Sequence, residues 1–317
     1  MTGKGRILVP GGTGYVGGRI AEALHQAGFA VRVVSRQARA WPGPAGELIE
    51  VVQCDWRVAA ERRRAINGCQ AVVMLAAANE IEAARDPVAA AEATATQCLA
   101  WLQSAREVAV SRFVYLSTVH VYGENRGARI TETTPPDPTH PYAETHLAAE
   151  LFVDAAGRRG DFLTTIFRLS NAFGAPIDFA VDRWTLLVND LARQAAVTGR
   201  LVLRSDGLDA RDFVPLCAVC NAIQWALAAP SPGRLYNLGS GQSLTVFEMA
   251  ARVAERHAHL FGYSPPIERP AAAPRALPSP YLLAVDALRR DGGLAALDWI
   301  DEIDTVLNFC KTHFGTK

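Results

Sequence analysis

The sequence predicts an α/β fold in which helices cover both faces of a doubly wound parallel sheet. Apolar runs alternate with longer amphipathic segments along the first half of the chain, as strands and helices do in such a sheet. A glycine-rich turn follows the first apolar run. Half of the 317 residues are hydrophobic, which is enough to bury a large core. Ligands of these sheets bind beyond the carboxyl ends of the strands, so we expect the functional residues there.

The first predicted unit is a strand, a glycine turn and a helix that opens near Gly14. Gly11, Gly14 and Gly17 have the spacing G-x-x-G-x-x-G. The first glycine suits a tight turn, the second lets backbone approach a pyrophosphate, and the third lets the helix pack close to the strand. The helix N-terminus, with Tyr15 and Val16, offers free N–H groups and a positive dipole end to phosphates. The unit predicts a dinucleotide site; the alternative is a glycine-rich surface turn.

The second predicted strand, over 30–35, bears on which dinucleotide is bound. Units that bind NAD place an acidic residue here against the ribose hydroxyls, whereas this chain has Ser35 and then Arg36. No carboxylate is present to repel a 2′-phosphate, and a guanidinium can bind one. The pattern favours NADP over NAD. The alternative is that Arg36 is a solvated loop charge.

Five further strands are predicted, over 49–55, 71–77, 112–117, 163–169 and 235–238. The first of them ends in Asp55, a carboxylate suited to an adenine amino group. The second contains Leu75 and Ala76, which we assign to the cofactor site. Asp86 is the expected N-cap of a long alanine-rich helix that runs to about residue 109.

The pattern loosens in the second half of the chain, where prolines become frequent. We therefore expect a dinucleotide-binding domain at 1–172, to which residues 213–240 return. Residues 173–212 and 241–300 would form a smaller, interleaved substrate lobe, followed by a C-terminal helix at 301–317.

Composition limits the partners and the compartment. The 32 basic and 32 acidic residues balance, so there is no basic footprint for nucleic acid. No apolar run approaches the roughly 20 residues that span a membrane. The first strand follows the start at once, so we expect no signal peptide. The six cysteines lie mostly in apolar runs, which indicates reduced thiols and a cytoplasmic protein. Cys217 and Cys220 form a C-x-x-C on a predicted helix, for which packing is favoured over zinc or redox chemistry.

Three side chains could carry chemistry near a nicotinamide. Thr139 or Asp137 is the expected cap of a helix on which Tyr142 and His146, four residues apart, share a face. Thr118 follows the strand at 112–117. A phenol beside a nicotinamide can exchange the proton that accompanies hydride transfer, and a hydroxyl can hold the reacting oxygen. The residues alone leave open that Tyr142 is a core residue and His146 a surface residue.

Six motifs occur in a fixed order along nearly the whole chain. They are the glycine turn at 11–17, Thr-x-x-Val-Tyr-Gly at 118–123, Pro-Tyr-x-x-x-His at 141–146, Arg-Leu-x-Asn-x-x-Gly at 168–174, Arg-Asp-Phe at 211–213 and Tyr-Asn-Leu-Gly-Ser-Gly at 236–241. In this order and spacing the chain resembles the extended short-chain dehydrogenases/reductases of the NAD-dependent epimerase/dehydratase family. The resemblance implies a Rossmann fold. It is highly specific for the family and less specific for the reaction.

The resemblance also implies residue roles. Tyr142 would be the acid/base residue, and Thr118 would bind the reacting oxygen. Asn171 and Arg211 would contact the diphosphate of a nucleotide sugar, with Arg275 as a weaker third contact. Charge-assisted bonds from arginine suit a diphosphate.

The role of Arg211 has an alternative, and the resemblance also implies an oligomeric state. Arg211 has a competing role as a structural ion-pair partner of Asp209 or Asp212. Relatives pair the helices that correspond to the alanine-rich helix at 86–109 and to the helix of Tyr142 with their copies, which implies a homodimer, although periodicity alone does not show it.

One departure from the family concerns its active-site lysine, which is His146 here. In the family this lysine holds the nicotinamide ribose and lowers the pKa of the tyrosine. An imidazole can still bond a ribose, and as imidazolium below about pH 6.5 it would partly replace the charge. A ketone reduction needs neutral Tyr142, whereas an oxidising first step needs its anion. The histidine therefore favours ketone reduction, with epimerisation left open.

A second departure concerns the two residues after Thr118. Sugar 4,6-dehydratases of the family have an Asp-Glu pair there, whereas this chain has Val119 and His120. Valine has no proton to move, which argues against 4,6-dehydration. His120 is either a second acid/base residue that faces the substrate or a pocket-lining histidine.

The sequence thus predicts an NAD(P)-dependent oxidoreductase or epimerase that acts on a nucleotide-activated sugar, with C4 as the expected carbon. One alternative is a reductase of a small carbonyl compound that carries no nucleotide. Another is a non-catalytic NAD(P)-binding sensor or scaffold.

Overall fold

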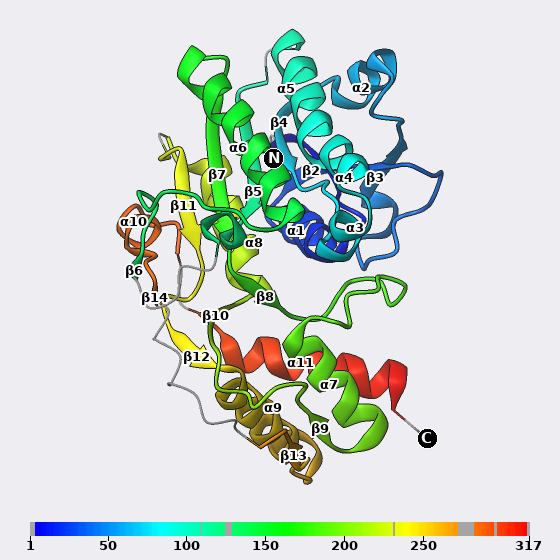
Figure 1. Ribbon diagram of the computed structural model, residues 1–317. Helices are drawn as coiled ribbons and strands as arrows, with labels where there is room; N and C mark the ends of the chain where they lie inside the picture. Colours follow the sequence, from blue (N-terminus) through cyan, green and yellow to red (C-terminus); the bar gives the residue numbers. More distant parts are fainter. Residues whose placement is uncertain are drawn as a thin grey trace.

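The central element of the fold is a seven-stranded, all-parallel sheet with the strand order β11-β7-β5-β4-β1-β2-β3. The computed structural model describes residues 4–108, 110–123, 129–230, 232–271, 282–294 and 297–315 (Figure 1). The strands of this sheet are β1 (Lys4–Pro10), β2 (Phe29–Ser35), β3 (Ile49–Gln53), β4 (Cys69–Met74), β5 (Arg112–Thr118), β7 (Leu163–Leu169) and β11 (Leu235–Leu238). The predicted doubly wound α/β class is confirmed. The strand order reverses between β1 and β4, which is where such sheets bind ligands.

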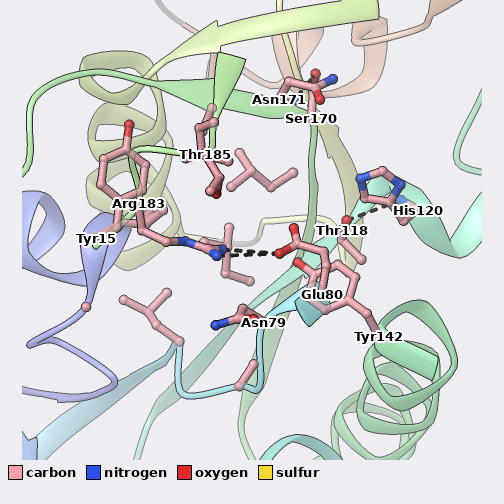
Figure 2. A pocket seen from close by; sticks show the side chains of 18 of the residues that line it. Tyr15, Asn79, Glu80, Thr118, His120, Tyr142, Ser170, Asn171, Arg183 and Thr185 are labelled. Carbon is pink, nitrogen blue, oxygen red and sulfur yellow. Dashed lines mark hydrogen bonds and ion pairs between the residues drawn. The ribbon is translucent and has the colours of Figure 1, made fainter. Parts of the chain in front are cut away.

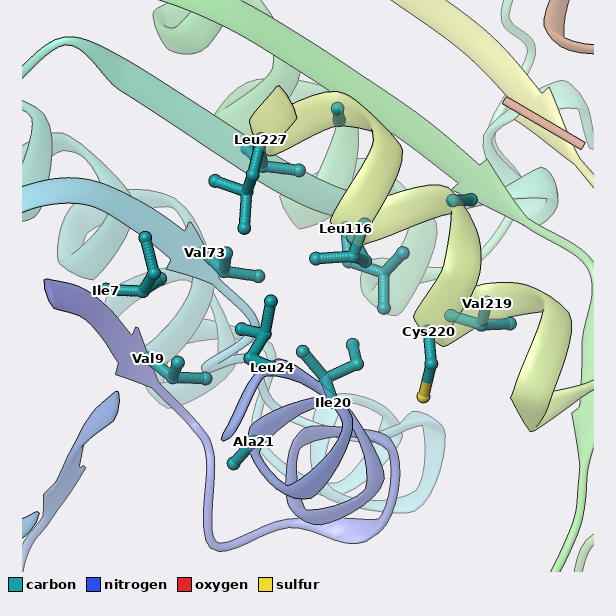
Figure 3. Packing of buried hydrophobic residues seen from close by; sticks show 14 of the residues in the cluster. Ile7, Val9, Ile20, Ala21, Leu24, Val73, Leu116, Val219, Cys220 and Leu227 are labelled. Atoms are coloured by element: carbon teal, nitrogen blue, oxygen red, sulfur yellow. The ribbon is translucent and has the colours of Figure 1, made fainter. Parts of the chain in front are cut away.

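Helices cover both faces of the sheet, which is why its strands read as apolar runs. The helices α1 (Tyr15–Gln26) and α8 (Leu216–Ala228) pack on one face, and α2 (Ala59–Ile66), α5 (Gln97–Glu107) and α6 (Pro141–Arg159) pack on the other. Figure 3 shows Ile20 and Leu24 of α1 beside Leu227 of α8, over Val73 of β4. All four side chains are buried. The predicted helix around Cys217 and Cys220 is thus confirmed as α8.

The long helix predicted from Asp86 forms with one irregularity. It consists of α4 (Pro87–Ala91), a π-helical segment (Glu92–Thr96) and α5. The Asp86 side chain accepts a hydrogen bond from the Ala89 N–H at 3.0 Å, which confirms the predicted cap. The π-helical turn brings the Thr94 hydroxyl to the Ala78 N–H, at 3.1 Å, just beyond β4. This contact ties the helix to the loop that leads into the candidate site.

Two local predictions are wrong. The N-cap of α6 is His140, and neither Thr139 nor Asp137 fills that position: the His140 Nδ1 accepts from the Tyr142 N–H at 3.1 Å. An imidazole with a free nitrogen replaces the usual hydroxyl or carboxylate acceptor there. The predicted strands 49–55 and 71–77 also end too late, since β3 ends at Gln53 and β4 at Met74. Beyond these points the chain turns into loops.

The smaller lobe lies below the carboxyl ends of the strands in Figure 1. Its helices α7 (Leu187–Thr198), α9 (Val246–Phe261) and α11 (Trp299–Phe314) share a hydrophobic core of their own. Its strands are β8 (Asn171–Phe173), β10 (Ala210–Pro215) and β12 (Ser243–Thr245), which form one sheet, with β9 (Leu201–Val202) and β13 (Ile267–Glu268) in another. The short elements are η1 (Gly46–Leu48), α3 (Glu80–Arg85), η3 (Val119–Tyr122), β6 (Arg129–Ile130), β14 (Leu282–Leu283) and α10 (Asp286–Arg290). Across the described ranges, no helix combines the length and apolarity that a membrane span requires.

Candidate active site

A cavity of about 460 Å³ lies at the carboxyl ends of the sheet strands, between the sheet and the smaller lobe. Its wall includes the glycine turn after β1, the loop after β4, the end of β5, the start of α6 and the segment before α7. Segments that are distant in the sequence therefore meet at the point where the strand order reverses. This is the place where the sequence predicted a ligand.

The glycine turn forms one end of the cavity. Gly11 has a φ of +85°, and a Cβ built on it would lie 2.5 Å from the backbone nitrogen of Ala76. A Cβ on Gly17 would lie 2.2 Å from the Gly11 carbonyl oxygen. Gly14 is the N-cap of α1, and its position offers no side chain to bond the first N–H groups of the helix. A glycine turn that no side chain can fill and a helix N-terminus without a side-chain cap both fit a dinucleotide pyrophosphate.

The predicted cofactor residues differ in their positions. Gly11, Gly14, Tyr15, Val16, Gly17 and Leu75 line the cavity. The Tyr15 hydroxyl, however, donates to the Gly174 carbonyl oxygen at 2.8 Å, so its side chain joins the two lobes. Ala76 is not part of the cavity wall, although its backbone is what limits the space at Gly11.

Arg36 and Asp55 also lie outside the cavity wall. Arg36 is exposed directly after β2, as the sequence predicted. Asp55 is exposed after β3, where its carboxylate accepts from the Arg57 N–H at 3.0 Å. Both side chains lie on the β2–β3 side of the glycine turn, and their contacts to a cofactor stay predictions.

The three predicted catalytic side chains, Thr118, Tyr142 and His146, all line the cavity. Figure 2 shows Thr118 and Tyr142 close to each other on its wall. Thr118 ends β5, Tyr142 lies in the first turn of α6, and His146 lies one turn further along that helix. The Tyr142 and His146 ring centroids are 4.6 Å apart. The Thr118 hydroxyl accepts from the His120 N–H at 3.2 Å. The arrangement places a phenol, a hydroxyl and imidazoles around the same space.

The Tyr142 phenol is held in its neutral form. Burial raises its pKa to about 12, and the Glu80 carboxylate adds to the rise, whereas the Thr118 hydroxyl and Arg183 oppose it. At neutral pH the phenol therefore carries its proton and can donate it.

The expectation that His146 becomes an imidazolium below about pH 6.5 is wrong. The side chain is 4% exposed, and burial, followed by the nearby His120, lowers its pKa to about 3. A buried imidazole with no opposite charge beside it resists protonation. His146 therefore does not replace the charge of a lysine. The alternative in which His146 is a surface residue is also wrong.

Beneath this wall, a buried ion pair supports the ends of β5 and β7. Arg168 and Glu150 approach to 2.6 Å, with both side chains 5% exposed. The Ser117 hydroxyl donates to Glu150 at 2.5 Å. Breaking such a pair leaves one charge buried without compensation, so these contacts hold the floor of the site in one arrangement.

The predicted substrate residues have different surroundings. Asn171 and Arg211 line the cavity, and Arg211 is exposed. The Asn171 side-chain amide donates to the Asp212 carbonyl oxygen at 2.7 Å. The Asp212 carboxylate is fully buried and accepts from Ser170, Ser240 and Gly241, and in the described part of the chain it forms no ion pair with Arg211. Arg275 lies outside the described residues.

Sequence reasoning missed an ion pair that crosses the cavity. Glu80, at the start of α3, and Arg183, before α7, approach to 3.5 Å (Figure 2). Both line the cavity, as do Asn79 and Thr185. The position of Glu80 just beyond β4 was the one available signal, because ligand-binding residues follow strand ends. No motif marked Arg183.

The profile of the NAD dependent epimerase/dehydratase family matches residues 7–239. The chain belongs to this family. A dTDP-D-glucose 4,6-dehydratase from Mus musculus is 29% identical over 154 residues, which are 49% of this chain and 42% of that protein, so less than half of that relative is spanned. A UDP-glucose 4-epimerase from Corynebacterium glutamicum is 27% identical over 267 residues, which are 80% of this chain and 81% of that protein. The structure of the Thermus thermophilus UDP-glucose 4-epimerase in complex with NAD superposes with a TM-score of 0.77 at 26% identity, over 97% of this chain and 99% of that one.

In this epimerase/dehydratase family member, Val119 and His120 follow Thr118. Val119 is buried in a small apolar cluster, so its side chain has a packing role. His120 lines the cavity, with its ring centroid 6.1 Å from that of Tyr142. Burial lowers the pKa of His120, and the Glu80 carboxylate works in the opposite direction. His120 therefore faces the cavity beside Tyr142.

Proposed function

We propose that the protein is an NAD(P)-dependent oxidoreductase that reduces a ketone, with C4 as the expected carbon, on a nucleotide-activated sugar. The observation that carries the proposal is the position of the neutral Tyr142 phenol. It lies beside the Thr118 hydroxyl, on the wall of the cavity that begins at the α1 N-terminus. That end of the cavity fits a dinucleotide, and the middle has room for a carbonyl next to a proton donor.

Cofactor binding would rest on the glycine turn and the start of α1. The N–H groups of Tyr15, Val16 and Gly17 would hold the pyrophosphate. Arg36 would bind a 2′-phosphate, which makes NADP the proposed cofactor and NAD the alternative. When bound, the dinucleotide would supply hydride-transfer chemistry at this site.

The chain's own residues would supply the proton and fix the oxygen. The Thr118 hydroxyl would donate a hydrogen bond that orients the carbonyl oxygen. As a hydride arrives at the carbon, the Tyr142 O–H would transfer its proton to that oxygen, so that C=O becomes CH–OH. No cation in the described wall takes the place of the family's lysine at position 146, so the phenol rests in its protonated form, which is the form that ketone reduction requires. This favours reduction over the oxidising first step of epimerisation.

Recognition of a nucleotide-activated sugar is supported by Asn171 and Arg211 on the cavity wall. A guanidinium suits a diphosphate through charge-assisted hydrogen bonds. UDP-glucose and dTDP-D-glucose occur in the names of the matched relatives, and both are sugar nucleotides.

We also propose that the protein is a homodimer through α5 and α6. Leu151 and Phe152 of α6 are 59% and 36% exposed. Leu99 and Leu102 of α5 and Phe152 line a groove between the two helices. Sedimentation equilibrium of the wild type and a Phe152→Glu variant tests this: the variant is expected to be monomeric, whereas a monomeric wild type would contradict the proposal.

The experiment that tests the proposed reaction follows nicotinamide absorbance with a 4-keto sugar nucleotide and NADPH. Net reduction consumes one NADPH per product alcohol, whereas an epimerase would interconvert hydroxy epimers with no net consumption. Interconversion of hydroxy epimers without net NADPH consumption would contradict the proposed reduction and show that the protein is an epimerase. No turnover of any sugar nucleotide would contradict both activities.

A second candidate is a non-catalytic dinucleotide-binding protein, which the buried neutral His146 favours. It predicts binding of the dinucleotide, no turnover, and a Tyr142→Phe variant without any consequence.

A further inference from the structure

The inference concerns Tyr115 and its contact with His146. Tyr115 lies in β5 with no exposed surface, and His146 lies in α6, which packs against that strand. The Tyr115 hydroxyl oxygen and the His146 Nδ1 are 2.8 Å apart. The contact joins sheet and helix directly behind Tyr142.

The proton in this hydrogen bond can lie on either partner, and the surroundings decide between the two arrangements. Burial raises the pKa of Tyr115 well above its usual value, so the phenol keeps its proton. The described residues offer this proton no acceptor other than the His146 Nδ1. If Nδ1 carried the proton instead, the buried phenol O–H would have no acceptor, which is unfavourable. The Tyr115 O–H therefore donates to Nδ1, and the single proton of the neutral imidazole lies on Nε2.

The second ring nitrogen of His146, Nε2, is the atom that would meet a ligand. It is buried, and in the part of the chain that the structure describes it has no hydrogen-bond partner. The His146 side chain also belongs to the cavity wall. A buried N–H without an acceptor costs free energy, and an oxygen of a bound molecule would recover it.

We propose that Tyr115 is a positioning residue that fixes His146 as the tautomer with its proton on Nε2, and that this N–H donates to an oxygen acceptor of the bound dinucleotide. The identity of the ligand rests on the proposed function. The part played by Tyr115 rests only on the contact between the two side chains.

Position 146 thus keeps a hydrogen-bond donor without any charge. A lysine orients its ammonium through a flexible stem, whereas the His146 ring is held by Tyr115 on one edge and packed against Tyr142 on its side. The direction of the donor is therefore set before a ligand arrives.

The first test is a ¹⁵N NMR spectrum of the ring nitrogens of the full chain without ligand at pH 7, with the His146 signals assigned by their loss in a His146→Gln variant. We expect a protonated Nε2 and an unprotonated Nδ1. A proton on Nδ1, or an imidazolium, would overturn the proposal. This readout needs no variant of Tyr115 and no dinucleotide.

The second test compares Tyr115→Phe with Tyr236→Phe. Tyr236 is a matched control, because its phenol is also buried and hydrogen-bonded, to Gly233 and Asp291, away from the cavity. Tyr115→Phe is expected to give a mixture of His146 tautomers and to weaken NADPH binding, measured by calorimetry, about twofold to fivefold, the upper value being that of one ordinary hydrogen bond. Tyr236→Phe is expected to change neither.

The outcomes separate this inference from the function on which it rests. A wild type that binds NADPH, together with a Tyr115→Phe variant of unchanged tautomer and affinity, would overturn the inference and leave the proposed function standing. A wild type that binds neither NADPH nor NADH would overturn the proposed function and the ligand named here. The spectrum without ligand would then still decide whether Tyr115 sets the tautomer.

Discussion

The two ends of the cavity are built in different ways. The end at which we propose that the dinucleotide binds consists mainly of backbone, in which Gly11 and Gly17 leave room that no side chain can fill and α1 begins without a side-chain cap. The end at which we propose that the substrate binds has charged and polar side chains from separate segments, such as Glu80 and Arg183. A backbone site is encoded by a few consecutive residues, whereas a side-chain site depends on which distant segments the fold brings together.

The largest expected effect comes from removing the proton donor. Tyr142→Phe should lower kcat for ketone reduction by about 10² to 10⁴-fold, the usual contribution of a positioned general acid. The dinucleotide Kd should change little, because the glycine turn and the α1 N-terminus, which would hold the pyrophosphate, are built of backbone and are unchanged in this variant. Tyr263→Phe, at a half-exposed residue remote from the cavity wall, is the control. Steady-state kinetics that show equal rates for Tyr142→Phe and wild type would remove Tyr142 from the mechanism.

The next effect should separate the two ends of the cavity. Arg211→Ala should raise the KM for a sugar nucleotide about tenfold to a hundredfold, since a charge-assisted hydrogen bond contributes about 1.5–3 kcal/mol. It should leave the affinity for NADPH and the rate with a small neutral ketone nearly unchanged. Arg204→Ala, at an exposed residue outside the cavity wall, should have no effect. An equal rise in the KM for the neutral ketone would show that Arg211 does not bind the diphosphate.

A third prediction concerns the free energy of unfolding and tests whether His146 is buried in its neutral form. His146 has a pKa of about 3 in the folded chain, against about 6.5 when unfolded, so below pH 6.5 the unfolded state binds more protons. The free energy of unfolding should therefore fall as the pH falls, by about 2 kcal/mol from this residue between pH 6.5 and pH 5. Urea unfolding at both pH values should show a smaller difference for His146→Gln than for wild type. The same difference in both proteins would mean that His146 is not buried in its neutral form.

The smallest effect should be that of the Glu80 carboxylate on the pKa of Tyr142. The Glu80 carboxylate contributes to the raised pKa of Tyr142, so Glu80→Gln should lower that pKa, by less than one unit because Glu80 is partly exposed. Difference spectra of phenolate formation against a Tyr142→Phe background give the value. Glu144→Gln, at an exposed residue of α6, should leave it unchanged. A rise in the Tyr142 pKa in Glu80→Gln would contradict the electrostatic account.

The same contrast explains how much could be predicted from the sequence. The strands, the glycine turn and the Asp86 cap follow from local periodicity and residue preferences, and the shared face of Tyr142 and His146 follows from helical spacing. That Thr118 joins these two side chains in one site was implied only by the resemblance to the family. The environment of each side chain does not follow from these signals. The burial of His146 depends on Tyr115, which lies 31 residues earlier in the chain, and this burial overturned the expected imidazolium.

The remaining misses have the same physical origin. An imidazole caps α6 because its free nitrogen happens to face the Tyr142 N–H, which no residue preference indicates. Arg183 meets Glu80 only because the smaller lobe folds against the ends of the sheet strands, since the two residues are 103 positions apart in the sequence. Contacts of this kind depend on tertiary structure, so a single sequence does not show them.

The proposed reaction requires the reacting carbonyl to lie beside Tyr142 and Thr118. A crystal structure of the complex with NADP⁺ and a sugar nucleotide tests this directly. We expect a sugar oxygen within hydrogen-bond distance of both the Tyr142 hydroxyl and Thr118 Oγ1, with the nicotinamide against the same carbon. A ligand that leaves this wall empty, or a nicotinamide position filled by protein, would contradict it.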